Sequence, residues 1–145
     1  MRVLGVDFGN KRIGLALSDE TGTVASPLTY IDGGGIAAVS REIARISADR
    51  RVGKIVVGVP LRLDGTRSEQ TEHTLAFIEE LERTTTVPVA KWDERLTSVQ
   101  ANRALLEGNV RRSERKQKID KVAAQIMLQS YLDATNPPST EAQTL

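Results

Sequence analysis

The sequence contains no cysteine and only one histidine, His73. Without cysteine the chain can form no disulfide, and it has no thiolate to offer as a nucleophile or a metal ligand. A single histidine also excludes a zinc site made of several histidines from one chain. A metal site in this protein would therefore consist mainly of oxygen ligands.

Aromatic residues and long apolar runs are also scarce. Phe, Trp and Tyr make up 3% of the 145 residues, so the core must consist mainly of Val, Ile, Leu and Ala. The longest apolar stretch, residues 55–61, is far too short to span a bilayer. An acid already occurs at Asp7, which is not typical of a secretory signal. We therefore expect a soluble, cytoplasmic protein.

The first part of the sequence predicts three sequential strands joined by tight turns. Residues 2–8, 12–18 and 24–31 are short runs of mainly apolar and small residues, separated by Gly-, Asn- and Asp-containing turns. Pro27 lies within the third of these runs and predicts an edge position or a bulge there. Three such strands in succession indicate an antiparallel meander.

The rest of the sequence predicts alternating helices and strands. Apolar residues at three- and four-residue spacing from Ile36 to Ile46 indicate an amphipathic helix. Residues 54–59 are a continuous β-branched run, typical of a parallel strand buried on both faces. The other expected elements are a helix at about 68–83, a strand at 87–92, a helix opened by Thr97 and Gln100 and closed by Gly108, and a final helix that contains Ile119 to Tyr131.

This order predicts an α/β fold with a five-stranded mixed sheet flanked by helices. We expect strands 1 to 3 to be antiparallel, and strands 1, 4 and 5 to be parallel. A single domain should cover residues 1–133. Residues 134–145 contain two adjacent prolines with scattered Ser and Thr, and we expect them to form a disordered tail.

Three carboxylates fall where such a sheet places its ligands, at the carboxyl ends of the parallel strands. Asp7 ends the first strand, Glu94 follows the fifth, and Asp120 lies at the start of the last helix. Acids that converge repel one another unless a cation lies between them, and hard oxygen ligands suit Mg²⁺ or Mn²⁺. Asp120 alone is better explained as an ordinary first-turn acid. A purely structural role explains Asp7 less well, because an acid that ends an apolar buried strand is costly without a partner.

Basic residues gather in one segment, although the net charge is only +1. Residues 103–121 contain seven Lys and Arg against three Asp and Glu, which indicates either a phosphate-binding patch or a solvated face. Arg12 and Arg95 adjoin the proposed acids and could each clamp a phosphate or pair with a neighbouring acid. The candidate nucleic-acid-binding residues are Arg12, Arg95, Arg111, Arg112, Arg115 and Lys116.

Four ordered motifs carry a family resemblance that runs from Arg2 to Asp133. They are Val6-Asp7-Phe8-Gly9-Asn10-Lys11-Arg12-Ile13-Gly14-Leu15-Ala16, Val57-Gly58-Val59-Pro60 with Asp64-Gly65, Asp93-Glu94-Arg95-Leu96-Thr97-Ser98, and the segment from Lys116 through Asp120 to Leu132. The chain thereby resembles the YqgF family, pre-16S rRNA nucleases also described as Holliday-junction-resolvase-like, in the ribonuclease-H-like superfamily. Leu63 departs from the pattern, since many relatives have Met there, but the exchange conserves volume.

The resemblance implies a ribonuclease-H-like fold and a hydrolase that cleaves nucleic-acid phosphodiesters. It implies a role in maturing the 5′ end of pre-16S rRNA, with pre-rRNA and ribosomal assembly particles as partners. Carried over by position, Asp7, Glu94 and Asp120 are the catalytic, metal-binding acids for Mg²⁺ or Mn²⁺. Asp93 is either a further ligand or a partner that holds Arg95.

Other functions compete with this interpretation. One is a DNA endonuclease that resembles Holliday-junction resolvases, and another is a non-catalytic RNA-binding factor for ribosome assembly. An actin-like nucleotide-binding fold also begins with such a strand–turn–strand motif, but it generally needs two domains, and 145 residues are too few. The sequence leaves open RNA or DNA as substrate, endo- or exonucleolytic cleavage, one metal or two, and the oligomeric state.

Overall fold

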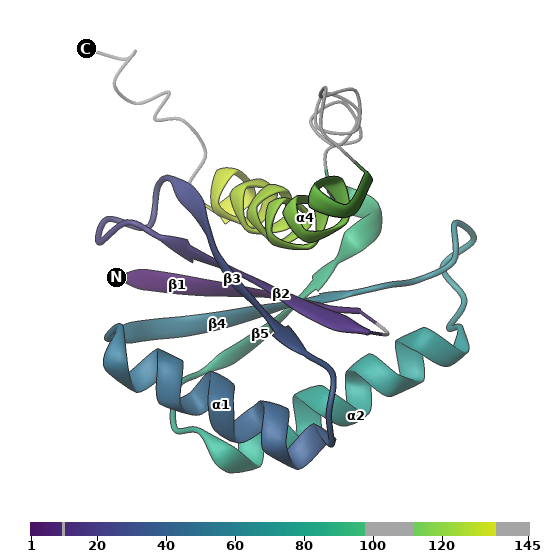
Figure 1. The fold of residues 1–145 in the computed structure, drawn as a ribbon, viewed down its shortest axis with the longest axis horizontal. Helices are drawn as coiled ribbons and strands as arrows, with labels where there is room; N and C mark the ends of the chain where they lie inside the picture. Colours follow the sequence, from purple (N-terminus) through teal and green to yellow (C-terminus); the bar gives the residue numbers. More distant parts are fainter. Residues whose placement is uncertain (10, 98–111, 136–145) are drawn as a thin grey trace.

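The computed structural model describes residues 1–9, 11–97 and 112–135, and for residues 112–121 it describes the backbone alone. A twisted sheet forms the middle layer, with α1 and α2 on one face and α4 on the other (Figure 1). The strands are β1 (Arg2–Phe8), β2 (Arg12–Ser18), β3 (Ala25–Asp32), β4 (Val52–Val59) and β5 (Val89–Asp93). The helices are α1 (Ile36–Asp49), α2 (Glu69–Thr84), the 3-10 turn η1 (Glu94–Leu96) and α4 (Arg112–Thr135).

The sheet has the strand order β3-β2-β1-β4-β5. β1 pairs antiparallel with β2, and β2 with β3. β1 pairs parallel with β4, and β4 with β5. The predicted five-stranded mixed sheet is therefore confirmed, and the carboxyl ends of β1, β4 and β5 lie at the same edge.

The predicted element boundaries hold most closely where the pattern is local. β1 and β2 have the bounds that the sequence predicts, and β3 is displaced by one residue. β3 is an edge strand, and its register with β2 shifts where Ala16 pairs with Pro27, because proline has no N–H to offer the ladder. The helix expected from Thr97 to Gly108 lies outside the described residues, apart from Thr97 itself.

The apolar residues of the strands divide into two cores. One packs under α1 and α2 and includes Leu4 and Val6 of β1, and the other packs under α4 and includes Val3. Side chains alternate between the faces of a strand, so Asp7 shares the face of Val3, toward α4. The alternation that builds both cores also aims this carboxylate at the α4 layer.

Helix α4 is fixed over β3 by polar contacts as well as by its apolar stripe. The Gln129 side-chain oxygen accepts a hydrogen bond from the Ala25 N–H at 2.9 Å, and the Gln125 amide donates to the Ala25 carbonyl at 3.1 Å. Ala124 and Leu128 face the sheet and are fully buried.

No helix in the described part of the chain has the length and hydropathy to cross a membrane.

Candidate active site at the carboxyl ends of β1, β4 and β5

Asp7 and Glu94 come from strands that do not neighbour each other. Asp7 lies near the end of β1, Glu94 opens η1 directly after β5, and β4 runs between them. Neighbouring strands are about 4.8 Å apart, so roughly 10 Å separates the two backbones. A glutamate side chain must therefore cross β4 if the two carboxyl groups are to meet.

Gly58 of β4 gives the glutamate this passage. A Cβ atom placed on Gly58 would lie 2.7 Å from Oε1 of Glu94 and 2.9 Å from its Cγ, closer than real Cβ contacts allow. The Glu94 side chain therefore lies directly over the glycine, and its carboxyl group hydrogen-bonds with the Asp7 side chain. The structure thus brings two of the three predicted acids together.

The close approach of Glu94 to β4 has a signal in the sequence that the predicted site did not include. Gly58 interrupts an otherwise β-branched buried run, and an isolated glycine inside a strand often marks a place where another group approaches the backbone. Gly58 is the site residue that residue-by-residue reasoning missed, since it has no side chain to suggest a role.

The environment of Glu94 opposes a second negative charge. Burial is the largest cause that raises the pKa of Glu94, to about 8, followed by the charge of Asp7, the hydrogen bond with Asp7 and the charge of Asp93. Two carboxyl groups in contact with little solvent favour the state in which they share one proton. A divalent cation would relieve the same repulsion, so this donor pair fits Mg²⁺ or Mn²⁺.

The Glu94 side chain also borders a small cavity between η1 and α4. The cavity has a volume of about 190 Å³, and Ala123 and Met127 line it from α4. Asp120, the third predicted acid, occupies a backbone position three residues before Ala123, and its side chain lies outside the described part. Among the side chains that the structure describes, no group of three or more His, Cys, Asp or Glu is placed to hold a metal.

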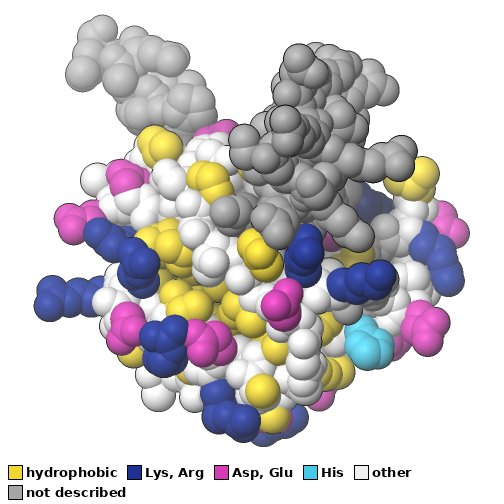
Figure 2. Space-filling view, viewed as in Figure 1, with side chains coloured by type: hydrophobic (Ala, Val, Ile, Leu, Met, Phe, Trp, Pro, Cys, Tyr) yellow, Lys and Arg dark blue, Asp and Glu magenta, His cyan; other side chains and the backbone are white. Residues whose placement is uncertain are grey.

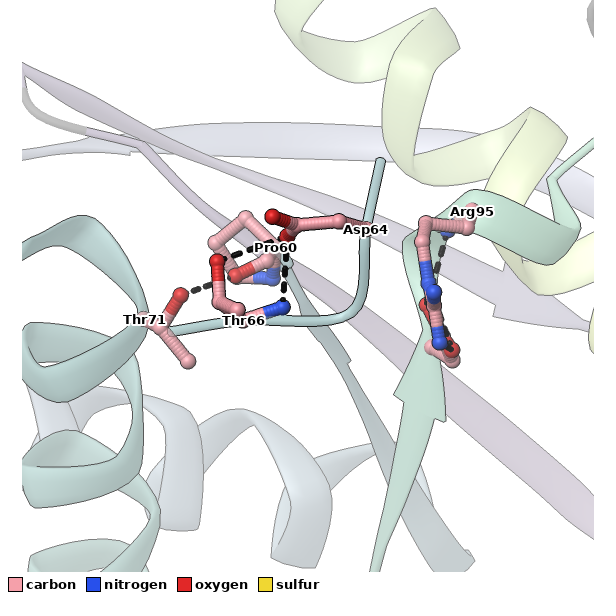
Figure 3. Close-up of polar contacts among 6 residues, drawn as sticks. Pro60, Asp64, Thr66, Thr71 and Arg95 are labelled. Atoms are coloured by element: carbon pink, nitrogen blue, oxygen red, sulfur yellow. Dashed lines mark hydrogen bonds and ion pairs between the residues drawn. The ribbon is translucent and has the colours of Figure 1, made fainter. Parts of the chain in front are cut away.

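Asp93 holds Arg95, which was one of its two predicted roles. The Arg95 guanidinium donates to the Asp93 carboxylate at 2.7 and 3.1 Å, and the Arg95 N–H donates to it at 3.0 Å. The guanidinium holds the pKa of Asp93 below its usual value. The Arg95 side chain lies beside the β4–α2 loop (Figure 3). Its Nη1 lies 3.2 Å from a Cβ position on Gly65 of that loop.

The other predicted nucleic-acid-binding residues are only partly described. The Arg12 guanidinium lies over the Tyr30 ring, 5.2 Å from its centre, on the β3 side of β1 and hence away from Glu94. Arg111 lies outside the described residues. The remaining three lie in the first turns of α4, where the structure describes the backbone alone: Arg112, Arg115 and Lys116.

A larger cavity, of about 800 Å³, lies between β3 and α1 on the other face of the sheet. Figure 2 shows apolar side chains among scattered charged ones on the side of the molecule where β3 lies in front in Figure 1. Three of the charged residues that line the cavity are engaged with one another, since Arg45 pairs with Glu42 and with Asp49. We therefore place the candidate chemistry at the carboxylate pair and not at the larger cavity.

Comparison with known proteins identifies the family. The family model described as "RuvX: Holliday junction resolvase" matches residues 1–134. The chain belongs to this family. A Thermoanaerobacter pseudethanolicus protein named "Putative pre-16S rRNA nuclease" is 42% identical over 135 residues, which cover 92% of this chain and 97% of the relative. A Myxococcus xanthus protein of the same name is 40% identical over 141 residues, covering 97% and 93%. The resemblance predicted from the four motifs is confirmed.

Solved structures confirm the ribonuclease-H-like fold. Thermus thermophilus RuvC in complex with a Holliday junction substrate superposes with a TM-score of 0.61, at 14% identity, over 94% of this chain and 96% of that one. The fowlpox virus Holliday junction resolvase superposes with a TM-score of 0.54, at 15% identity, over 92% and 99%. At these identities the likeness concerns the fold alone.

Proposed function

We propose that this protein is a divalent-metal-dependent nuclease that hydrolyses phosphodiesters of structured RNA in 5′-end processing of pre-16S rRNA. The observation that carries the proposal is the contact of Asp7 with the partly buried Glu94 across Gly58. The names of the relatives, which cover nearly the whole chain, support rRNA as the substrate.

The proposed roles follow from the positions of the side chains. Asp7 and Glu94 would hold the metal ion, and Asp120 would complete the ligand set. Bound Mg²⁺ or Mn²⁺ would activate the attacking water and stabilise the leaving oxygen. Arg95, oriented by Asp93, would bind a phosphate beside the carboxylates, because guanidinium groups match phosphate oxygens in geometry and charge.

A four-way DNA junction is the second candidate substrate. The description of the family model and the solved RuvC complex both name Holliday junctions. Both substrates would use the same carboxylates, and they differ in the surface that must recognise them.

A cleavage assay with two substrates tests the proposal. The purified protein is incubated with a pre-16S rRNA 5′ leader and with a four-way DNA junction, in Mg²⁺, in Mn²⁺ and in EDTA. We expect metal-dependent cleavage of the RNA and no cleavage in EDTA. Cleavage of the junction alone would favour the second candidate, and tight RNA binding without cleavage in either metal would favour a non-catalytic assembly factor.

Gly58→Ala tests the passage that brings the carboxyl groups together. The new Cβ would overlap Glu94 and displace its carboxyl group, so we expect the cleavage rate to fall about tenfold or more, since misplacing a reacting group is costly. The affinity for Mn²⁺, measured by titration calorimetry, should fall as well. Gly34→Ala is the matched control, because nothing lies within 4 Å of a Cβ at that glycine. Wild-type rate and Mn²⁺ affinity in Gly58→Ala would refute the role of this contact.

A further inference from the structure

Leu63 is an apolar side chain that the fold leaves in water. Its exposure is 95%, the highest among the large hydrophobic residues of the described part of the chain. It lies in the loop that joins β4 to α2, on the segment that also carries Asp64 and Gly65. A leucine this exposed gains nothing from burial, so its stabilising contribution to the fold is minimal.

Hydrogen bonds hold the tip of this loop in one conformation. The Asp64 carboxylate accepts hydrogen bonds from the Thr66 N–H at 2.9 Å and from its hydroxyl at 2.7 Å (Figure 3). The Arg62 N–H donates to the Thr66 carbonyl at 3.0 Å, and the Gly65 N–H donates to the Arg62 carbonyl at 2.8 Å. Gly65 has a φ of +88°, which favours glycine. Leu63 is thus presented on a structured turn.

The base of the loop is held as firmly. Leu61 and Arg67 form a β-bridge, and the Thr71 hydroxyl donates to the Pro60 carbonyl (Figure 3). Thr71 also forms a capping box with Ser68 at the start of α2. Both ends of the loop are therefore fixed to the sheet and to α2, so that the position of Leu63 relative to the carboxylate pair is fixed as well.

Two guanidinium groups, those of Arg62 and Arg95, contact the loop that carries Leu63. Arg62 donates to the Arg67 carbonyl at 2.9 Å and to the Thr66 hydroxyl at 3.4 Å, and both acceptors are uncharged. Arg95 lies against Gly65 of the same loop and pairs with Asp93, the residue before Glu94. The loop therefore joins the rim of the carboxylate pair.

One apolar side chain among guanidinium groups suits a nucleic acid better than a protein. Protein partners bind contiguous apolar patches, whereas nucleic acids present phosphates beside stacked bases. Proteins that distort nucleic acids insert Leu, Met or Phe between base steps while Arg and Lys hold the backbone. The arrangement around Leu63 has both parts.

We propose that Leu63 inserts against a nucleobase beside the cleaved phosphate and unstacks it. The location of this contact rests on the proposed function, because the carboxylate pair defines which phosphate is cleaved. The contact would favour substrates whose bases unstack easily, such as the junction between a helix and a single strand.

The experiment uses 2-aminopurine, a base whose fluorescence rises when it unstacks. A pre-16S rRNA 5′ leader and a four-way DNA junction each carry it at single positions around the cleavage site or the branch point, in Ca²⁺ buffer. Saturating wild-type protein should raise the fluorescence at one position by about threefold or more. Leu63→Ala should lose this rise and cleave about tenfold more slowly in Mg²⁺, as expected for a lost base contact.

Two variants control for other causes. Leu63→Met keeps an apolar side chain of similar volume and should retain the fluorescence rise. Val24→Ala shortens another exposed apolar residue, 56% exposed, in the β2–β3 turn at the opposite end of β1, and should match the wild type. A rise that persists in Leu63→Ala would overturn the proposal, as would the absence of any rise with the wild type on both probes. A rise with the wild type but no cleavage of either probe in Mg²⁺ or Mn²⁺ would overturn the proposed function and support the base contact.

Discussion

Asp7→Asn is expected to reduce cleavage at least about a thousandfold, which corresponds to ~4 kcal/mol of transition-state stabilisation. The amide keeps the shape of the carboxylate and removes its charge, so the metal would lose a ligand while the fold keeps its packing. Single-turnover cleavage of the pre-16S leader at saturating Mg²⁺ measures the effect. The variant should remain folded by circular dichroism, because an amide beside Glu94 removes a repulsion.

Asp49→Asn is the matched control for this substitution. Asp49 ends α1 on the opposite face of the sheet and pairs with Arg45 at 2.8 Å in an exposed ion pair. Such pairs contribute little to stability, so the control should cleave at the wild-type rate. If Asp7→Asn cleaves structured RNA as fast as the wild type, the proposed mechanism is wrong, and binding through the basic residues remains as the function.

The fold was predictable because its signals are local. The turn around Gly9 ends β1, the turns around Gly9 and Gly22 bound β2, and Pro27 correctly predicts the edge strand. The composition after Asp133 predicts a tail, and the end of the last helix was left open. Pro137 disfavours helix only at the residue before it, and α4 continues through Thr135, whose hydroxyl donates to the Tyr131 carbonyl at 2.9 Å.

The site was predictable in its members and not in their contacts. Asp7 and Glu94 stand out because strand ends of a parallel sheet gather at one edge. Their meeting depends on Gly58, a long-range contact that no local pattern encodes. The choice between the two roles of Asp93 depended on the turn from β5 into η1, which brings Arg95 back onto its carboxylate.

Glu94→Gln is expected to stabilise the metal-free protein at pH 8 while it abolishes metal-dependent cleavage. Burial and Asp7 raise the pKa of Glu94 from 4.5 to about 8. Between these values the folded state keeps a proton that the unfolded state releases, so the wild type loses stability as the pH rises toward 8. Glutamine carries no such charge. The expected gain grows as the pH rises from about 4.5 toward 8, and it should vanish below about pH 4.5.

Urea unfolding at pH 5 and pH 8, in EDTA and in saturating Mg²⁺, measures this effect. Glu79→Gln, on the exposed face of α2, is the control and should follow the pH profile of the wild type. Mg²⁺ should stabilise the wild type and leave Glu94→Gln nearly unchanged, because a ligand stabilises only the state that binds it. The order of stability at pH 8 should therefore reverse between EDTA and Mg²⁺. The opposite result would be a Glu94→Gln protein that is less stable than the wild type in EDTA at pH 8. It would show that the carboxyl group of Glu94 stabilises the fold, and that its position beside Asp7 is not evidence for a cation site.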